Sequence, residues 1–500
     1  MSGPGAAARP DVLPLVPAPR RAVATPGDPL HLGAATRVVA AGGAAAVGPL
    51  VAGRLGARLG REVPVRADDD GRPGAVVLRL VPGPAADGGT DAGDPPGAYR
   101  VTVDGARAVV EAADADGLRH GAATLDQLVV RTPDGGAGLR RAEVADAPRF
   151  GWRGLHLDVA RHFHDAATVR ALLDVAWSLR LNRLHLHLTD DQGWRIEVPS
   201  RPRLTEVSGA TAVDGDPGGF FTVADLAAIQ AYGAERGITV VPEIDLPGHV
   251  NAALHAYPEL TPDGAGVPPY TGIEVGFSRL HADVPATAAF VRDVLADVAA
   301  MTEGPYLHVG GDEALTLEAD EYARLVAIVA EEVRRAGKTL VGWQEVARAR
   351  LAPGSLVQVW DDREDLSAVA DAARRGARVI LSPARRTYLD QKPHAGFPVG
   401  LDWAGTVELR DAYEWEPADV VPGLPPAAVA GVEAALWTET IRTRDEVLTM
   451  LLPRLAAVAE VAWSEPGRRS WPDFAARVAA LAPTWDEAGL PWYRSPQVDW

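Results

Sequence analysis

Asp312 and Glu313 are two adjacent carboxylates at the end of the segment LHVGGDE, which spans Leu307–Glu313. Its apolar start is typical of a buried strand, and an ionised carboxylate is strongly disfavoured inside an apolar strand core. Both acids are therefore expected at a strand end that faces a cleft, where carboxyl groups can act as general acids and bases. This segment indicates function more strongly than any other part of the chain.

The elements that would position this pair recur along the chain from Phe150 onward. Helical stretches lie between most of the β-rich runs: one places apolar residues at Val169, Leu172 and Ala176, and another begins at the potential N-cap Thr222. Eight strands separated by helices are typical of a (β/α)8 TIM barrel, so the predicted fold class is α/β. The eight predicted strands are Gly154–Ala160, Arg183–Thr189, Thr239–Asp245, Tyr306–Gly311, Thr339–Gln344, Ser355–Trp360, Arg378–Ser382 and Ala430–Trp437.

Polar and aromatic residues follow these strands, and barrel active sites lie at the carboxyl ends of the strands. The mixture is typical of sugar binding, because sugars stack their apolar faces on indole rings and hydrogen-bond to carboxylates and guanidinium groups. In chain order the candidates are Asp158, Arg161, Asp190, Asp191, Glu243, Asp245, His249, Asp312, Glu313, Trp343, Trp360, Tyr388, Asp390, Trp437 and Glu439.

The chain divides into a predicted small amino-terminal α+β accessory domain, residues 1–148, and a catalytic barrel, residues 149–500. Alternating apolar positions and turn residues define the elements of the first part, which contains no residue that suggests chemistry. These elements are an amphipathic helix along Val47, Val51, Leu55 and Leu59, a strand at Ala75–Val81, a surface loop at Gly83–Gly97, and a hairpin of Tyr99–Val103 with Ala108–Ala112.

The composition limits the partners and the location of the protein. A formal net charge of −18 disfavours nucleic-acid binding, because a phosphate-binding surface needs clustered Lys and Arg. The absence of cysteine excludes disulfides, thiolate nucleophiles and Cys-ligated metals. No segment offers the roughly 18 apolar residues of a membrane helix, and Met1–Pro10 lacks the apolar stretch of a signal peptide. As written, the sequence predicts a cytoplasmic protein, or a secreted one if a native leader is missing from it.

Seven blocks along the predicted barrel carry a family resemblance. They are DVARHF (Asp158–Phe163), HLHLTDDQGWR (His185–Arg195), VPEIDLPGH (Val241–His249), HVGGDE (His308–Glu313), VGW (Val341–Trp343), TYLD (Thr387–Asp390) and LWTE (Leu436–Glu439). In this order the blocks resemble the β-N-acetylhexosaminidases of glycoside hydrolase family 20. Two earlier blocks, VLPLVPAPR (Val12–Arg20) and GLRHGAATLDQL (Gly117–Leu128), are similar to that family's amino-terminal domain.

The resemblance implies exo-acting, retaining removal of terminal N-acetylglucosamine or N-acetylgalactosamine from a small oligosaccharide or glycoconjugate. In this substrate-assisted mechanism the 2-acetamido carbonyl of the sugar attacks C1 and forms an oxazolinium intermediate, so the protein needs no nucleophile, cofactor or metal. Glu313 would be the general acid and later the general base. Asp312 would accept a hydrogen bond from the acetamido N–H and stabilise the developing positive charge.

The resemblance also assigns the aromatic residues by matched position. Tyr388 would donate its hydroxyl to the acetamido oxygen, and Trp343, Trp360 and Trp437 would surround the acetamido methyl group and underlie the ring. Trp403, in the motif LDWAG, would stack nearer the leaving group.

The remaining matched positions are polar. Arg161, Asp390 and Glu439 would hold the ring hydroxyls of a terminal sugar. Asp190 and His249 would form a pair behind the general acid that fixes its rotamer and tunes it.

Two other classes remain open. His185 and His187 form an H-x-H on a predicted strand, as in metal-dependent amidohydrolases, where both imidazoles bind the ion. That class requires a bridging lysine or more histidines at later strand ends, whereas the only lysines are Lys338 and Lys392. Both histidines are therefore expected to pack inside the barrel, hydrogen-bonded to neighbours. A catalytically silent carbohydrate-binding barrel would lack one of the acids, but both are present.

Overall fold

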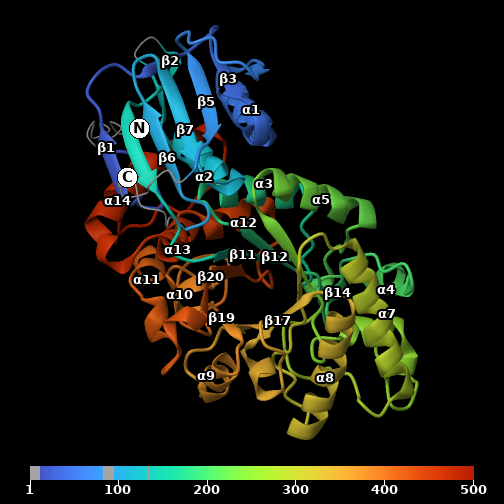
Figure 1. The fold of residues 1–500 in the computed structure, drawn as a ribbon. Coiled ribbons are helices and arrows are strands. Elements are labelled where there is room, and N and C mark those ends of the chain that lie inside the picture. Colours follow the sequence, from blue (N-terminus) through green and yellow to red (C-terminus); the bar gives the residue numbers. More distant parts are fainter. Residues whose placement is uncertain (1–11, 83–94, 133–134) are drawn as a thin grey trace.

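The computed structural model describes residues 12–82, 95–132 and 135–500, which form a closed barrel and an amino-terminal sheet (Figure 1). The barrel strands pair in parallel in chain order, and the last strand closes on the first. All eight predicted strands and the TIM-barrel class are confirmed. The strands are β11 (Trp152–Asp158), β12 (Arg183–His187), β15 (Thr239–Glu243), β16 (Tyr306–His308), β17 (Thr339–Trp343), β18 (Leu356–Val359), β19 (Arg378–Leu381) and β20 (Val429–Leu436).

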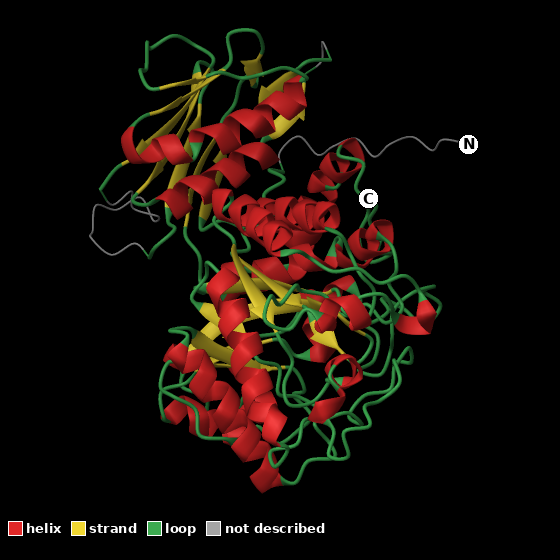
Figure 2. Ribbon diagram, turned by 90° about the vertical axis from the view of Figure 1, so that its right-hand side faces the viewer, coloured by secondary structure: helices red, strands yellow, loops and turns green. Residues whose placement is uncertain are grey.

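Helices cover the outside of the barrel (Figure 2). Thr222 caps α5 through a capping box with Asp225, as predicted, which satisfies backbone N–H groups at the start of the helix. The 3-10 helix η4 (Gln344–Arg348) directly follows β17. The α-helices of this part are α3 (Ala166–Ser178), α4 (Arg203–Ser208), α5 (Val223–Glu235), α6 (Asn251–Ala256), α7 (Pro285–Met301), α8 (Ala319–Arg335), α9 (Ser367–Arg374), α10 (Ala384–Thr387), α11 (Leu409–Tyr413), α12 (Arg444–Leu451), α13 (Arg454–Trp463), α14 (Trp471–Leu481) and α15 (Pro483–Glu487).

The amino-terminal unit is a seven-stranded mixed sheet with helices α1 (Gly48–Leu59) and α2 (Ala115–Gln127) packed on it (Figure 1). The predicted amphipathic helix is confirmed as α1, and the predicted hairpin as β6 and β7, which pair antiparallel. The predicted loop Gly83–Gly97 lies mostly outside the described residues. The sheet contains β1 (Arg21–Ala24), β10 (Ala142–Asp146), β6 (Tyr99–Val103), β7 (Arg107–Ala112), β5 (Ala75–Leu80), β3 (Arg37–Ala40) and β4 (Val65–Arg66); β2 (Leu30–Leu32), β9 (Ala137–Leu139) and β8 (Val129–Arg131) form a smaller sheet.

Buried polar contacts join the amino-terminal unit to the barrel. Glu460 of α13 accepts hydrogen bonds from both Nη atoms of Arg477, at 2.8 and 2.7 Å, and from the backbone N of Ala18 at 2.9 Å. Arg153, near the start of β11, donates to His120 of α2 at 3.2 Å. The amino-terminal unit therefore contacts the barrel at the amino ends of its strands, opposite the ends that carry the candidate residues. Among the described residues, no helix is long and apolar enough to span a bilayer.

Candidate active site

The turn after β16 projects the two acids. Gly310 and Gly311 have φ values of 63° and 101°, and Glu313 itself has a φ of 44°, a region that glycine adopts more readily than other residues. The turn packs on Asp245: the backbone N of Gly311 donates to Asp245 Oδ1 at 3.1 Å, and a Cβ added to Gly310 would lie 1.7 Å from the same oxygen. The two glycines of GGDE thus let the chain pass over Asp245.

Gly310→Ala is expected to destabilise the protein more than Gly337→Ala. Both glycines have a positive φ, but a Cβ at Gly337 would meet no atom within 4 Å, so Gly337→Ala carries only backbone strain. The clash with Asp245 should add about 1–3 kcal/mol of overpacking cost at Gly310. Chemical denaturation of both variants measures this difference, and equal losses would show that the turn yields without cost.

His249 lies beside both acids. Its Nε2 is 3.5 Å from Glu313 Oε2 and 3.7 Å from Asp312 Oδ2. The Glu313 side chain is 29% exposed, whereas that of Asp312 is only 11% exposed. Burial raises the pKa of Asp312 to about 6; the neighbouring Glu313 adds to the rise and His249 opposes it.

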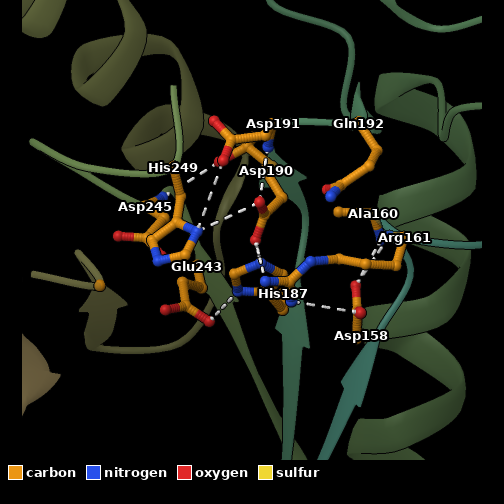
Figure 3. Close-up of polar contacts among 12 residues, drawn as sticks. Asp158, Ala160, Arg161, His187, Asp190, Asp191, Gln192, Glu243, Asp245 and His249 are labelled. Carbon is orange, nitrogen blue, oxygen red and sulfur yellow. Dashed lines mark hydrogen bonds and ion pairs between the residues drawn. The ribbon is translucent and has the colours of Figure 1, made fainter. Parts of the chain in front are cut away.

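Asp190 lies behind His249 and fixes its charge. Asp190 Oδ1 is 3.2 Å from His249 Nδ1, and Asp190 Oδ2 is 2.8 Å from both Arg161 Nη2 and His187 Nε2 (Figure 3). Burial alone would raise the pKa of Asp190, but Arg161 and His249 hold it well below its ordinary value. Burial would likewise lower the pKa of His249, but Asp190 beside it holds it well above its ordinary value. His249 is therefore a positively charged neighbour of the acid pair.

The H-x-H histidines are hydrogen-bonded inside the barrel, as expected for the packed alternative. His185 contacts Glu433 Oε1 through Nδ1 and Glu243 Oε2 through Nε2, both at 2.9 Å. His187 contacts Glu243 Oε2 at 2.7 Å and Asp190 Oδ2 at 2.8 Å (Figure 3). Each ring nitrogen thus has a carboxylate partner, and the chain of contacts runs from Glu433 to Asp190.

The predicted aromatic residues gather at the strand ends. Trp343 and Trp437 have ring centroids 5.7 Å apart, Tyr388 lies 6.1 Å from Trp437, and Trp360 packs against this cluster. Trp403 stands edge-on to Trp360 at 5.9 Å and to Tyr388 at 6.1 Å, and it is 44% exposed. Trp343, Trp437 and Tyr388 therefore form a buried wall of the site, and Trp403 lies at its solvent-exposed edge.

Arg161, Asp390 and Glu439 meet around Trp437. Arg161 lies over the Trp437 ring at 4.9 Å, and Asp390 Oδ1 accepts from the backbone N of Trp437 at 3.4 Å. Burial raises the pKa of Asp390 to about 7 and that of Glu439 to about 8, and Arg161 partly opposes the rise at Glu439. Arg161 also forms ion pairs with Asp158 and Asp190, so it connects this polar group to residues at the ends of the first two barrel strands.

Three buried carboxylates for which the sequence predicted no role form hydrogen bonds to tryptophan or histidine side chains in and behind the site. Glu345 accepts from Trp360 Nε1 at 3.2 and 3.3 Å, and Glu243 accepts from Trp343 Nε1 at 2.9 Å. Glu433 interrupts the apolar run of β20, which was the one signal in the sequence that could have identified it. The pairing of each carboxylate with its tryptophan or histidine depends on the closed barrel.

Comparisons with known proteins agree over nearly the full length of the chain. The sequence pattern "Glycosyl hydrolase family 20, catalytic domain" matches residues 150–321 and 319–466, and "Glycosyl hydrolase family 20, domain 2" matches residues 12–147. A β-N-acetylhexosaminidase of Cellulomonas fimi is 52% identical over 98% of both chains. The N-acetyl-β-hexosaminidase structure of Streptomyces plicatus is 42% identical over 98% of both chains, with a TM-score of 0.90. The β-N-acetylhexosaminidase of Streptomyces coelicolor A3(2) is 41% identical over 98% of this chain and 99% of its own, with the same TM-score.

Proposed function

The chain belongs to glycosyl hydrolase family 20 and is an exo-acting β-N-acetylhexosaminidase, and on this premise we propose how its residues divide the reaction. The acetamido carbonyl oxygen of the bound sugar bonds to C1 as the C1–O glycosidic bond breaks. Glu313 gives its proton to the departing oxygen, and its carboxylate then takes a proton from the water that attacks C1. That attack breaks the bond between C1 and the carbonyl oxygen and restores the acetamido group.

Asp312 is the partner of the acetamido nitrogen. Its carboxylate accepts the N–H hydrogen bond and stabilises the positive charge of the oxazolinium ion. The observation that carries this division is the contrast within the acid pair: Glu313 is the more exposed side chain, whereas Asp312 is nearly buried beside His249. A group that must exchange protons with a leaving group and with water needs the more open position.

His249 supports the proton transfer from Glu313 through its charge. It is held positive by Asp190, and its Nε2 lies 3.5 Å from Glu313 Oε2. A positive charge at this distance stabilises the carboxylate that Glu313 becomes after proton transfer. Arg161 and His187 in turn hold Asp190 by contacts of 2.8 Å, so the histidine cannot turn away without breaking a buried network.

The aromatic and polar clusters define the substrate. Trp343, Trp360 and Trp437 surround the acetamido methyl group, and the Tyr388 hydroxyl donates to the acetamido oxygen. Arg161, Asp390 and Glu439 hold the ring hydroxyls of a terminal sugar, which fits small oligosaccharides or glycoconjugates ending in N-acetylglucosamine or N-acetylgalactosamine.

A pair of aryl substrates tests this function. Because the substrate supplies the nucleophile, the aryl β-N-acetylglucosaminide should be hydrolysed, and the matching aryl β-glucoside should be essentially inert. The leaving group is the same in both, so the ratio of kcat/KM isolates the acetamido group. Comparable rates on the two substrates would mean that the protein itself supplies the nucleophile.

The pH profile tests the charge on Asp312. Its pKa of about 6 means that the carboxylate needed for catalysis is lost as the pH falls through 6, so kcat/KM should fall by up to tenfold per unit below that value. Measuring kcat/KM from pH 4 to 8 locates this limb. Asp312→Asn, which has no carboxyl to titrate, should lack the limb in its residual activity; an unchanged limb in that variant would assign it to another group.

A further inference from the structure

Asp245 is a buried carboxyl beside the acid pair that the reaction above does not use. Its Oδ1 accepts from the backbone N of Gly311 at 3.1 Å, and its backbone N donates to Thr189 Oγ1 at 3.0 Å. Asp245 Oδ2 is buried and has no hydrogen-bond partner among the described residues. The same is true of Asp312 Oδ1. A buried carboxylate oxygen without a donor is strongly disfavoured, so two such oxygens on neighbouring residues require an explanation.

The two carboxyls are close enough to interact strongly. One oxygen of Asp245, one oxygen of Asp312 and one ring nitrogen of His249 all lie within 4.8 Å of one another. Two negative charges at this separation in a buried site repel each other, and such pairs are stabilised when they share one proton. Burial raises the pKa of both carboxyls and outweighs the positive charges of His249 and His187, which oppose this rise.

We propose that Asp245 is a positioning residue that keeps a proton on Oδ2 and directs it toward Asp312, so that the pair carries one negative charge and that charge stays on Asp312. The inference rests on the role proposed above for Asp312. It explains both orphaned oxygens with one hydrogen atom: the acid O–H is the donor that Asp312 lacks. It also gives Asp312 a neutral neighbour, so the ionised carboxylate remains free to stabilise the oxazolinium ion.

Burial determines which of the two holds the proton. Counted over the whole residue, Asp245 is 1% exposed and Asp312 is 8% exposed, so the charged form costs more at Asp245. Burial, and then the charge of Asp312, hold the pKa of Asp245 well above its ordinary value, although His249 opposes the rise. The other ionisable groups facing Asp245 are His187 and Asp190 from the β12 side, Glu243 at the end of β15, and Tyr322 of α8.

The protonated state of Asp245 can be measured without substrate. A carboxyl that is neutral in the folded protein and ionised in the unfolded chain stabilises the fold at low pH, and this contribution is lost as the pH rises. The ratio of the unfolding constant of the wild type to that of Asp245→Asn should therefore rise by up to about tenfold per pH unit between pH 5 and 7. Asp165→Asn is the matched control, because hydrogen bonds from Thr168 lower the pKa of this N-cap carboxyl and its ratio should be flat. A flat ratio for Asp245→Asn would overturn the proposal.

A second variant and two further measurements keep the result decisive. If Asp245→Asn does not fold, Asp245→Ala must show the same slope, because the slope depends on the lost carboxyl and not on its replacement. On the native protein at pH 6, the infrared difference between wild type and the folded variant should contain one protonated carboxyl C=O band, and its absence would also overturn the proposal.

In kinetics, the acid limb of kcat/KM should stay in place in Asp245→Asn; a shift to lower pH by about one unit would mean that Asp245 is ionised in the wild type. The stability and infrared results do not depend on the catalytic role of Asp312, so the two ideas can fail separately.

Discussion

Glu313→Gln is expected to lower kcat/KM on a chitobiose-type substrate by at least roughly 10²–10⁴-fold, the usual loss when a general acid is removed. The amide keeps the shape of the side chain but has no proton to give the departing oxygen. Aryl substrates with activated leaving groups should be spared in the first step, since they need little protonation. A series of aryl N-acetylglucosaminides with different leaving-group pKa values measures this as a steeper slope of log rate against leaving-group pKa.

The control for this variant is Glu318→Gln, which alters an exposed carboxylate at the start of α8. It should reproduce the wild-type slope and stability. Near-normal activity of Glu313→Gln on the chitobiose-type substrate, with the fold intact, would remove Glu313 from the role of acid.

Asp312→Asn is expected to give a loss of similar size with a different pattern. Removing a preorganised group that stabilises developing charge costs about 10²–10³-fold in known cases. Because its partner is the substrate amide, the loss should be nearly the same for every leaving group, and the line of log rate against leaving-group pKa should drop in parallel. The variant should also lose more affinity for a cationic mimic of the intermediate than for the uncharged sugar product, each compared with the wild type.

The comparison of the two variants is the decisive measurement. A parallel drop for Glu313→Gln and a steeper slope for Asp312→Asn would exchange the two roles, even though the family assignment would stand. Equal slopes for both variants would mean that the two acids act as one unit. The structure allows this outcome, because both acids lie close to the same histidine, His249, at 3.5 and 3.7 Å.

The barrel and its acid pair could be predicted because their signals are local. Each strand is a short apolar run, and the two glycines of GGDE indicate a turn directly after the strand. The amphipathic helix α1 and the cap at Thr222 were predictable for the same reason, since both depend on residues within a few positions of one another.

The network behind the acids could not be predicted because its contacts join distant parts of the chain. His185 and Glu433 lie on different strands, β12 and β20, and nothing in the sequence pairs them before the barrel closes. The contact of Glu460 with Ala18 joins the two ends of the chain in the same way. Asp245 stood among the strand-end candidates, but its position beneath Gly310 follows only from the packing of the β16 turn on the loop after β15.

The histidine and glutamate chain inside the barrel limits how this active site can be transplanted. Its contacts link β12, β15, β16 and β20 through buried imidazoles and carboxylates. An engineer who copied only the GGDE turn, His249 and Trp343 onto another barrel would leave His249 without Asp190, and Trp343 without Glu243. Residues that must be inherited together are also slow to diverge one at a time, so directed evolution should find new specificities on the exposed rim around Trp403 sooner than in this interior.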